Sequence, residues 1–167
     1  MAEVGDALGT LESIWIAGEA QQAPVRVDRV RALVGRGLEG DRYAVGAGTF
    51  SGSVRASTRD LSLIDGGAAR EVLAELGGDR TLGDLRRNLV LAGVDLEGLV
   101  TARLRLGEVV IEVTGTCPPC GHLDRLLGVE AQGLLANRGG LRAGILTGGW
   151  LEEGATVCLE RASRRLP

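Results

Sequence analysis

The residues best suited to chemistry gather in the segment Cys117–His122, which reads Cys-Pro-Pro-Cys-Gly-His and contains the only histidine of the chain. The thiolate form of cysteine is the nucleophile and the ligand for soft metals. A helix that begins at Gly121 would place backbone N–H groups near at least one sulfur and favour the thiolate. The segment therefore predicts a thiolate that binds a metal, carries a persulfide or forms a disulfide.

Other interpretations of these thiols stay open. A zinc site usually has four ligands, and the missing one could come only from Cys158 or a distant carboxylate. The Cys-x-x-Cys spacing is also typical of dithiol oxidoreductases, although these place the motif at the start of a long helix in a βαβ setting. Two partly buried cysteines in a proline-stiffened turn are the simplest alternative. Cys158 lies in an apolar stretch, and we expect it to be structural.

Arginines beside glycine or asparagine form the second group of candidates, because a guanidinium fork and bare backbone N–H groups can converge on an anion such as phosphate. We expect Asp41 to orient its neighbour rather than to act as an acid. Each cluster by itself is equally compatible with a solvated surface, and His122 alone is more typical of a structural, hydrogen-bonded residue. The clusters are Asp41-Arg42, Arg86-Arg87-Asn88, and Arg138-Gly139-Gly140 followed by Arg142.

The charged residues exclude several mechanisms. The 167-residue chain has 19 arginines, no lysine and 22 acidic residues, which gives a net charge of −3. Without lysine it cannot form the internal aldimine that holds pyridoxal phosphate, and it cannot supply the lysine of a phosphate-binding P-loop. Any bound anion must be held by arginine, backbone N–H groups or the amino terminus.

The remaining composition excludes further classes. Two Trp, one Tyr and one Phe leave few platforms for base stacking, which together with the acidic balance argues against nucleic-acid binding. No apolar run approaches the roughly 20 residues that span a bilayer, and the amino-terminal residues do not resemble a signal peptide. We therefore expect no membrane association and a cytoplasmic protein whose three cysteines are free or functional.

The hydrophobic pattern predicts one domain over residues 1–167, mainly β, with a few short helices. Asp65 stands at the N-cap position of the clearest helix, which covers residues 68–76 and ends at Gly77-Gly78. A glycine-rich loop is expected over residues 35–52, and an antiparallel barrel or sandwich is the favoured architecture. The predicted strands cover 10–17, 24–31, 59–64, 88–92, 103–106, 109–114, 141–147 and 155–161, and two short helices cover 123–127 and 129–136.

Five segments in this order, spread over about residues 10–160, resemble the MOSC domain. This is the carboxy-terminal domain family of molybdenum cofactor sulfurases, and it also occurs as small stand-alone bacterial proteins. The resemblance implies a MOSC-type antiparallel β-barrel that binds the molybdenum cofactor (molybdopterin), or carries sulfur for it. The matching segments are Gly37–Arg42, Arg59–Ile64, Arg86–Val90, Cys117–Leu123 and Arg138–Ala143.

The resemblance also implies roles for the candidate residues. Cys120 would ligate molybdenum or hold a persulfide, and Cys117 would be an accessory thiol. The arginine clusters would line a pocket for the pterin phosphate, with His122 and Asn88 supporting them. A separate cysteine desulfurase would donate sulfur, and a molybdoenzyme or metal–sulfur cofactor would accept it. Pyridoxal phosphate is associated with the family through the fused desulfurase, but a chain without lysine cannot bind it covalently.

Two other functions remain as alternatives. Larger relatives reduce N-hydroxylated compounds with the help of an added amino-terminal barrel and, in some, an iron–sulfur domain. This chain has no room for either, so such a reductase would need a partner as electron donor. The second alternative is a structural barrel that contains zinc or simple thiols and no cofactor.

Overall fold

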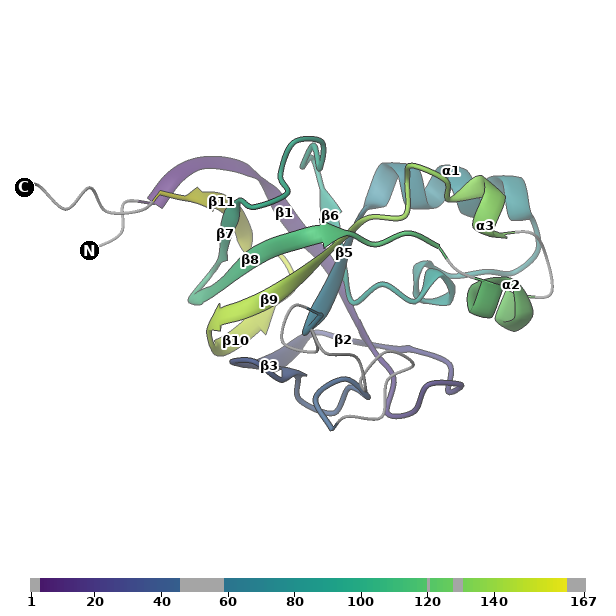
Figure 1. The fold of residues 1–167 in the computed structure, drawn as a ribbon, viewed down its shortest axis with the longest axis horizontal. Coiled ribbons are helices and arrows are strands. Elements are labelled where there is room, and N and C mark those ends of the chain that lie inside the picture. Colours follow the sequence, from purple (N-terminus) through teal and green to yellow (C-terminus); the bar gives the residue numbers. More distant parts are fainter. Residues whose placement is uncertain (1–3, 46–58, 120, 128–130, 162–167) are drawn as a thin grey trace, which may run out of the picture.

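A closed β-barrel forms the body of the protein (Figure 1). The computed structural model describes residues 4–45, 59–119, 121–127 and 131–161. Its barrel strands are β1 (Val4–Ile16), β5 (Leu61–Asp65), β6 (Leu89–Ala92), β7 (Arg103–Leu106), β8 (Val109–Thr116), β9 (Leu141–Thr147) and β11 (Thr156–Glu160). Within the described residues, seven strands follow one another in the order β11-β7-β8-β9-β5-β6-β1, and β1 pairs back onto β11. The predicted mainly-β barrel is confirmed.

A small second sheet flanks the barrel. It consists of β10 (Gly149–Glu152), β3 (Arg29–Leu33) and β4 (Gly37–Leu38), while β2 (Val25–Val27) extends the main sheet beside β1. The prediction of one strand over 24–31 is wrong, because the chain changes partners around Asp28, from β1 to β10. The predicted loop over 35–52 likewise contains β4, and its residues 46–52 lie outside the described ranges.

Alternating side chains of the strands serve two separate cores. Leu63 on β5 and Leu89 on β6 point into the barrel and join its central cluster. Their neighbours Ile64 and Val90 face outward and pack with residues of the helices. Strands that are buried on both faces read as nearly continuous apolar runs, and Leu89–Ala92 of β6 is such a run.

A βαβ unit interrupts the antiparallel pattern. From β5 the chain continues through α1 (Gly66–Leu76) and the 3₁₀ helix η2 (Leu82–Leu85) into β6, which lies parallel to β5 with Leu63 opposite Leu89. The sequence pattern predicted only antiparallel neighbours, so this parallel pairing was not predicted. The predicted N-cap is confirmed, since the Asp65 carboxylate accepts a hydrogen bond from the N–H of Ala68 (2.8 Å).

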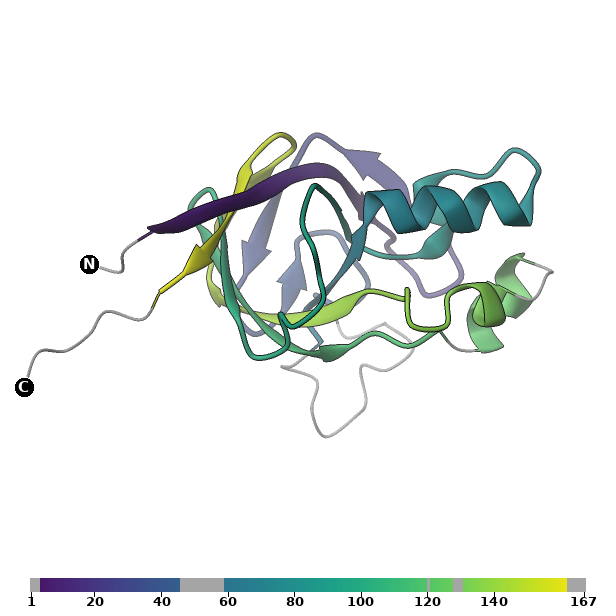
Figure 2. The ribbon, with the colours of Figure 1, turned by 90° about the horizontal axis from the view of Figure 1, so that it is seen from above.

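The helices gather at one end of the barrel, opposite the end where β1 begins and β11 finishes (Figures 1 and 2). Besides α1 they are α2 (Gly121–Leu127) and α3 (Ala131–Leu134). The helix start predicted at Gly121 is confirmed. The predicted helix over 129–136 is shorter, and residues 129 and 130 lie outside the described ranges. No helix in the described residues is long and apolar enough to span a membrane.

The β7–β8 hairpin sets the position of the thiol segment. Its two strands pair antiparallel across the turn at residues 107–108, with Leu106 opposite Val109. Strand β8 runs on to Thr116, where it still pairs with Leu141 of β9. Cys117 therefore leaves the barrel directly beside the beginning of β9.

Candidate functional site

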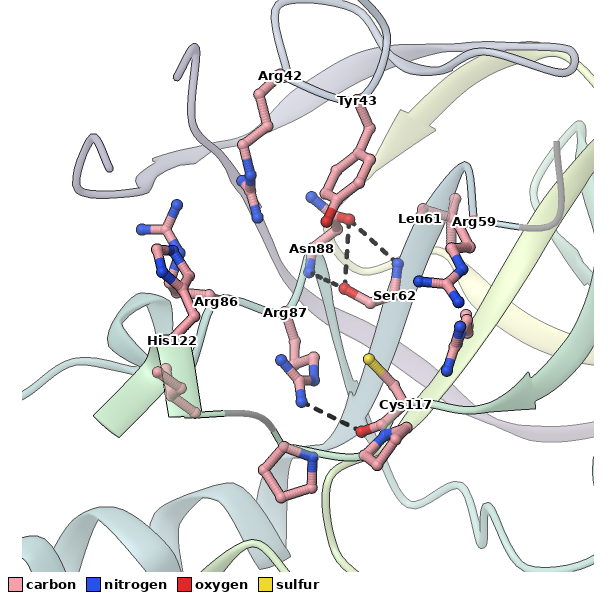
Figure 3. Close-up of a pocket in the computed structure, with 14 residues that line it drawn as sticks. Arg42, Tyr43, Arg59, Leu61, Ser62, Arg86, Arg87, Asn88, Cys117 and His122 are labelled. Atoms are coloured by element: carbon pink, nitrogen blue, oxygen red, sulfur yellow. Dashed lines mark hydrogen bonds between the residues drawn. The ribbon is translucent and has the colours of Figure 1, made fainter. Parts of the chain in front are cut away.

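A cavity of about 290 Å³ lies where the helices meet the barrel (Figure 3). We call it the arginine pocket. Arginine is the commonest of its described lining residues, with five copies, and none of those lining residues is Asp or Glu. Its described lining residues are Arg42, Tyr43, Arg59, Leu61, Ser62, Arg86, Arg87, Asn88, Cys117, Pro118, Pro119, His122, Leu123 and Arg142.

The parallel pairing of β5 and β6 brings distant segments together at the pocket. Since parallel strands begin at the same edge of a sheet, Arg59 and Ser62 on the β5 side lie near the residues that lead into β6. Strand β9 runs antiparallel to β5 and places Arg142 opposite Ser62. The end of β8 adds Cys117.

Arg87 connects the segments that form the pocket wall. It is buried and donates hydrogen bonds to the backbone carbonyls of Gly139 (2.7 Å), Leu85 (3.2 Å) and Cys117 (3.2 Å). A guanidinium carries five N–H donors in a rigid fork, so Arg87 can hold this framework and still present donors to a ligand.

Arg86 is held by a different loop. Its guanidinium donates to the carbonyls of Ala20 (2.6 Å) and Gln22 (2.8 Å), between β1 and β2. Its backbone is left-handed (φ 59°, ψ 36°), a conformation that is unfavourable for a residue with a Cβ. Burial lowers the pKa of Arg86, and the positive charge of Arg42 lowers it further.

Asp41 and Arg42 form a buried pair. The Asp41 carboxylate is fully buried and accepts hydrogen bonds from the N–H of Ala17 (2.9 Å) and of Tyr43 (3.3 Å). It lies 3.5 Å from Nη1 of Arg42, whose guanidinium also sits 4.9 Å from the Tyr43 ring. Asp41 is not among the described residues that line the pocket. This arrangement fits its expected role of orienting Arg42.

Asn88 lines the pocket but uses its amide within the protein. Its Oδ1 accepts from the N–H (3.1 Å) and the hydroxyl (3.3 Å) of Ser62, and its Nδ2 donates to the carbonyl of Trp15 (3.1 Å). Asn88 thereby ties together β1, β5 and β6.

One of the two predicted thiols is visible at the site. Cys117 is a free cysteine, and its sulfur points into the pocket between Arg87 and Arg59 (Figure 3). Cys120, the predicted ligand, lies outside the described residues. His122 lines the pocket from the first turn of α2, and its buried Nε2 has no hydrogen-bond partner in the described structure.

The third arginine cluster is divided between two places. Arg142 lines the pocket, and its Nε donates to the carbonyl of Thr116 (3.0 Å). Arg138 instead pairs with Glu71 (3.4 Å) and Glu75 (3.3 Å) of α1, because the turn before β9 directs it toward the helices. The expectation that Arg138 joins the other arginines in one pocket is therefore corrected.

The two glycines of that cluster support the thiol segment from behind. The carbonyl of Gly139 accepts a hydrogen bond from Arg87, and the carbonyl of Gly140 accepts one from the N–H of Cys117 (2.8 Å). With Arg138 they line a second cavity of about 1100 Å³, which shares the wall Cys117–Pro119 with the arginine pocket. They are not among the described residues that line the arginine pocket, which corrects the expectation that this segment lines it together with the arginines.

Three residues that line the pocket, Tyr43, Arg59 and Ser62, were not predicted as site residues from the sequence. Arg59 and Ser62 lie in a segment that carried the family resemblance, but only the parallel β5–β6 pairing shows that they face Arg87 and Asn88. Tyr43 directly follows the buried Asp41-Arg42 pair. The sequence feature that could have identified Tyr43 as a site residue is its position next to a predicted anion-binding arginine.

The described residues give little support to the two thiol alternatives. They contain no group of three or more His, Cys, Asp or Glu side chains that could hold a metal ion, although Cys120 is not among them. A thioredoxin-like dithiol needs a long helix after the motif. Here α2 has seven residues, and β8 before it is antiparallel to both of its neighbours.

Fold and site together define a small β-barrel protein with a cationic, thiol-bearing pocket suited to an anionic ligand. The family profile of the MOSC domain matches residues 47–157. The chain belongs to the MOSC domain family. The segment Gly37–Arg42 precedes the matched range, yet it supplies Arg42 to the same pocket.

Solved structures share this fold at low sequence identity. The YUAD protein from Bacillus subtilis superposes with a TM-score of 0.78 at 17% identity, covering 98% of this chain and 100% of its own. YiiM from Escherichia coli gives 0.62 at 22% identity (95% and 72% covered), and YiiM from Geobacillus stearothermophilus gives 0.63 at 13% (94% and 75% covered). No curated protein matches the sequence.

Proposed function

We propose that this MOSC protein binds the molybdenum cofactor in the arginine pocket and uses Cys120 as a soft ligand or persulfide carrier in the cytoplasm. The observation that carries the proposal is the pocket itself. Five arginines, a thiol and no carboxylate occur among its described lining residues. Guanidinium groups keep their charge at any pH of interest, so this pocket favours an anionic ligand.

The residues present fit the proposed group. Phosphate oxygens match the fork geometry of arginine, and thiolate is a preferred ligand of soft metal centres. The cavity of about 290 Å³ is close to the lower end of the range of small-molecule sites. When bound, the cofactor would supply a metal centre and sulfur ligands. The protein would supply charge neutralisation, orientation and a neighbouring thiol.

Sulfur transfer to this protein would be an exchange between persulfides. The Cys120 thiolate would attack the outer sulfur of a cysteine persulfide on a separate desulfurase. A new S–S bond forms on Cys120 as the donor S–S bond breaks, and the donor cysteine leaves as a thiolate. No net oxidation or reduction occurs. The nearby positive charge of the arginines would favour the attacking thiolate.

The thiol assignment can be tested with Cys120→Ser, Cys117→Ser and the double variant. Each would be incubated with a cysteine desulfurase and cysteine, separated from it, and assayed for cyanide-releasable sulfur. Binding of purified molybdenum cofactor would be measured in parallel by gel filtration. We expect Cys120→Ser to lose both signals and Cys117→Ser to keep at least part of each. Loss in Cys117→Ser alone would contradict the assignment to Cys120.

The same samples distinguish the other functions. Reduction of N-hydroxylated compounds by the loaded protein with an electron donor would identify a catalyst rather than a carrier. Stoichiometric zinc, with unfolding on chelation, would identify a structural zinc barrel. Either result in the absence of sulfur transfer would overturn the proposed carrier role.

A further inference from the structure

The second cavity lies against the same thiol segment as the arginine pocket, because the residues Cys117–Pro119 line both. Its volume of about 1100 Å³ is nearly four times that of the arginine pocket, which has about 290 Å³. Sites for small molecules rarely exceed roughly 1,000 Å³. The second cavity, which we call the acidic groove, is therefore better matched to a segment of another protein than to a small ligand.

The charge of the acidic groove is opposite to that of the arginine pocket. Its described lining residues include three carboxylates, Asp65, Asp95 and Glu97, and one guanidinium, Arg138. Arg138 already pairs with two glutamates of α1. Asp95 and Glu97 are exposed and form no ion pair with the described residues. The groove therefore offers uncompensated negative charge to a partner.

The groove also has an apolar surface and a fixed outer wall. Val100 is 41% exposed at this surface. The wall is the β6–β7 connection, where the Asp95 carboxylate accepts from the N–H of Glu97 (2.9 Å) and Thr101 donates to the carbonyl of Val113 on β8 (2.9 Å). A surface that is ordered before binding loses little conformational entropy when a partner docks. The other apolar lining residues include Val94, Leu96, Pro118, Pro119, Ala136 and Leu141.

The two cavities give the thiol segment two approaches. The sulfur of Cys117 points into the arginine pocket (Figure 3), where a bound cofactor would fill the available volume. A protein that delivers sulfur while this pocket is occupied must reach the segment from elsewhere. A partner in the acidic groove would contact Pro118 and Pro119 without entering the arginine pocket. Cys120, the proposed persulfide carrier, directly follows Pro119 in the sequence.

We propose that the acidic groove is the docking site for the sulfur donor, and that it takes a segment of the cysteine desulfurase that carries arginine or lysine beside apolar side chains. The inference rests on the proposed function, because that function requires a separate donor. Opposite charges on two surfaces speed their encounter and fix their orientation. The acidic groove would select the donor protein, while the arginine pocket holds the cofactor.

Persulfide loading of the full chain tests this docking site. Initial rates of formation of cyanide-releasable sulfur are measured against increasing concentrations of the desulfurase. We expect Glu97→Lys to raise the half-saturating desulfurase concentration about tenfold, and this increase to shrink with added salt. Val100→Ser should raise it several-fold. Asp79→Lys is the matched control, because it reverses an exposed carboxylate outside the described lining of both cavities and should leave the value unchanged.

A small donor separates docking from the sulfur exchange itself. Glutathione persulfide passes its outer sulfur to the thiolate in the same exchange and leaves as glutathione thiolate. It needs no docking surface, so it should load Glu97→Lys and Val100→Ser at the wild-type rate. An equal slowing with glutathione persulfide would show that the substitutions disturb the thiol segment, and would overturn the docking site.

Two further results would also overturn it. One is an unchanged half-saturating desulfurase concentration in both groove variants. The other is a defect only in sulfur transfer to the acceptor protein, which would make the acceptor the occupant of the groove. If the wild-type chain is loaded by both donors and the groove variants have no effect, only the docking site is contradicted. If neither donor loads the wild-type chain, the proposed function fails and the donor docking fails with it.

Discussion

Arginines serve opposite purposes at the two ends of the molecule. On the barrel wall, Arg105 binds Glu160 through two hydrogen bonds (2.7 and 2.8 Å), and Arg103 pairs with Glu112 (3.0 Å). In the arginine pocket, Arg42 pairs with the buried Asp41 at 3.5 Å, but none of the described lining residues themselves is a carboxylate beside the five arginines. The first region neutralises its own charge, whereas the second leaves positive charge for a ligand. An arginine-rich, lysine-free composition therefore does not by itself mark a binding site.

The pKa shifts follow the same division. The hydrogen bond from Arg105 holds the pKa of Glu160 below its usual value, and that of Arg105 is raised in return. In the pocket, burial and the charge of Arg42 lower the pKa of Arg86. Opposite charges stabilise each other on the wall, while like charges oppose each other in the pocket.

The largest expected loss of stability follows from replacing Gly140, whose carbonyl accepts a hydrogen bond from the N–H of Cys117. Gly140 has φ +91°, and a Cβ there would collide with the backbone carbonyl of Leu63. Gly140→Ala should lower the free energy of unfolding by about 3 kcal/mol or more, since steric overlap adds to backbone strain. Gly154, near the opposite end, also has positive φ (+87°) but open space. Gly154→Ala should cost only about 1 kcal/mol.

Urea unfolding of both glycine variants measures the difference. Equal losses in the free energy of unfolding of Gly140→Ala and Gly154→Ala would show that only the backbone conformation determines the cost. The close packing behind the thiol segment would then make no contribution.

Removal of the bridging guanidinium should have the next largest effect. Arg87→Met leaves the buried carbonyls of Leu85 and Gly139, and the partly buried carbonyl of Cys117, without this donor. We expect a loss of about 2–4 kcal/mol in stability. Arg103→Met on the barrel wall should cost less than about 1 kcal/mol, because its pair is exposed. The free energy of unfolding of both variants can be measured by thermal and chemical unfolding. Equal losses in Arg87→Met and Arg103→Met would show that Arg87 does not organise the pocket wall.

The pH dependence of stability should have opposite signs for two carboxylates. Burial raises the pKa of Asp60 in the folded protein. The contribution of its carboxyl group to stability is therefore present at low pH and is lost as the pH rises through this raised pKa. The pKa of Glu160 is lowered by Arg105, so its contribution is present at neutral pH and is lost as the pH falls. From about pH 4 to 7, Asp60→Asn should therefore gain stability relative to wild type.

Glu160→Gln should instead fall progressively behind wild type as the pH rises from about 3 to 6. Unfolding free energies measured across this range for both variants give the two slopes. Slopes of the same sign would contradict the assigned environments.

The smallest effect concerns the exposed pair on the barrel wall. A double-mutant cycle on Arg103 and Glu112 should give a coupling of about 0.2–1 kcal/mol that shrinks with added salt. Salt should act in the opposite sense in the pocket, where screening relieves repulsion between Arg42 and Arg86. A coupling energy between Arg103 and Glu112 above about 2 kcal/mol, or one that does not change with salt concentration, would contradict the contrast between the barrel wall and the arginine pocket.

Much of the fold could be predicted because its strands carry strong local signals. Strands β7, β8 and β9 are confirmed, and so is the Asp65 N-cap. Strand β10 was missed because Gly148-Gly149 resembles a turn, whereas its partner β3 lies far away in sequence. Pairings over such distances have no local signature.

The site was predictable only in part for the same reason. Arg42, Arg86 and Arg87 could be recognised from their glycine and asparagine neighbours. Arg59 could be placed only from the parallel pairing of β5 with β6, which the local pattern does not encode. Arg138 has the same local composition, but the acidic face of α1 binds it instead.

The central claim is that the arginine pocket holds an anionic molybdenum cofactor. The most direct test is elemental and pterin analysis of the full chain purified from a host that makes this cofactor. We expect molybdenum and pterin in equal, stoichiometric amounts, and their loss in Arg42→Gln. Stoichiometric zinc with neither molybdenum nor pterin would contradict it.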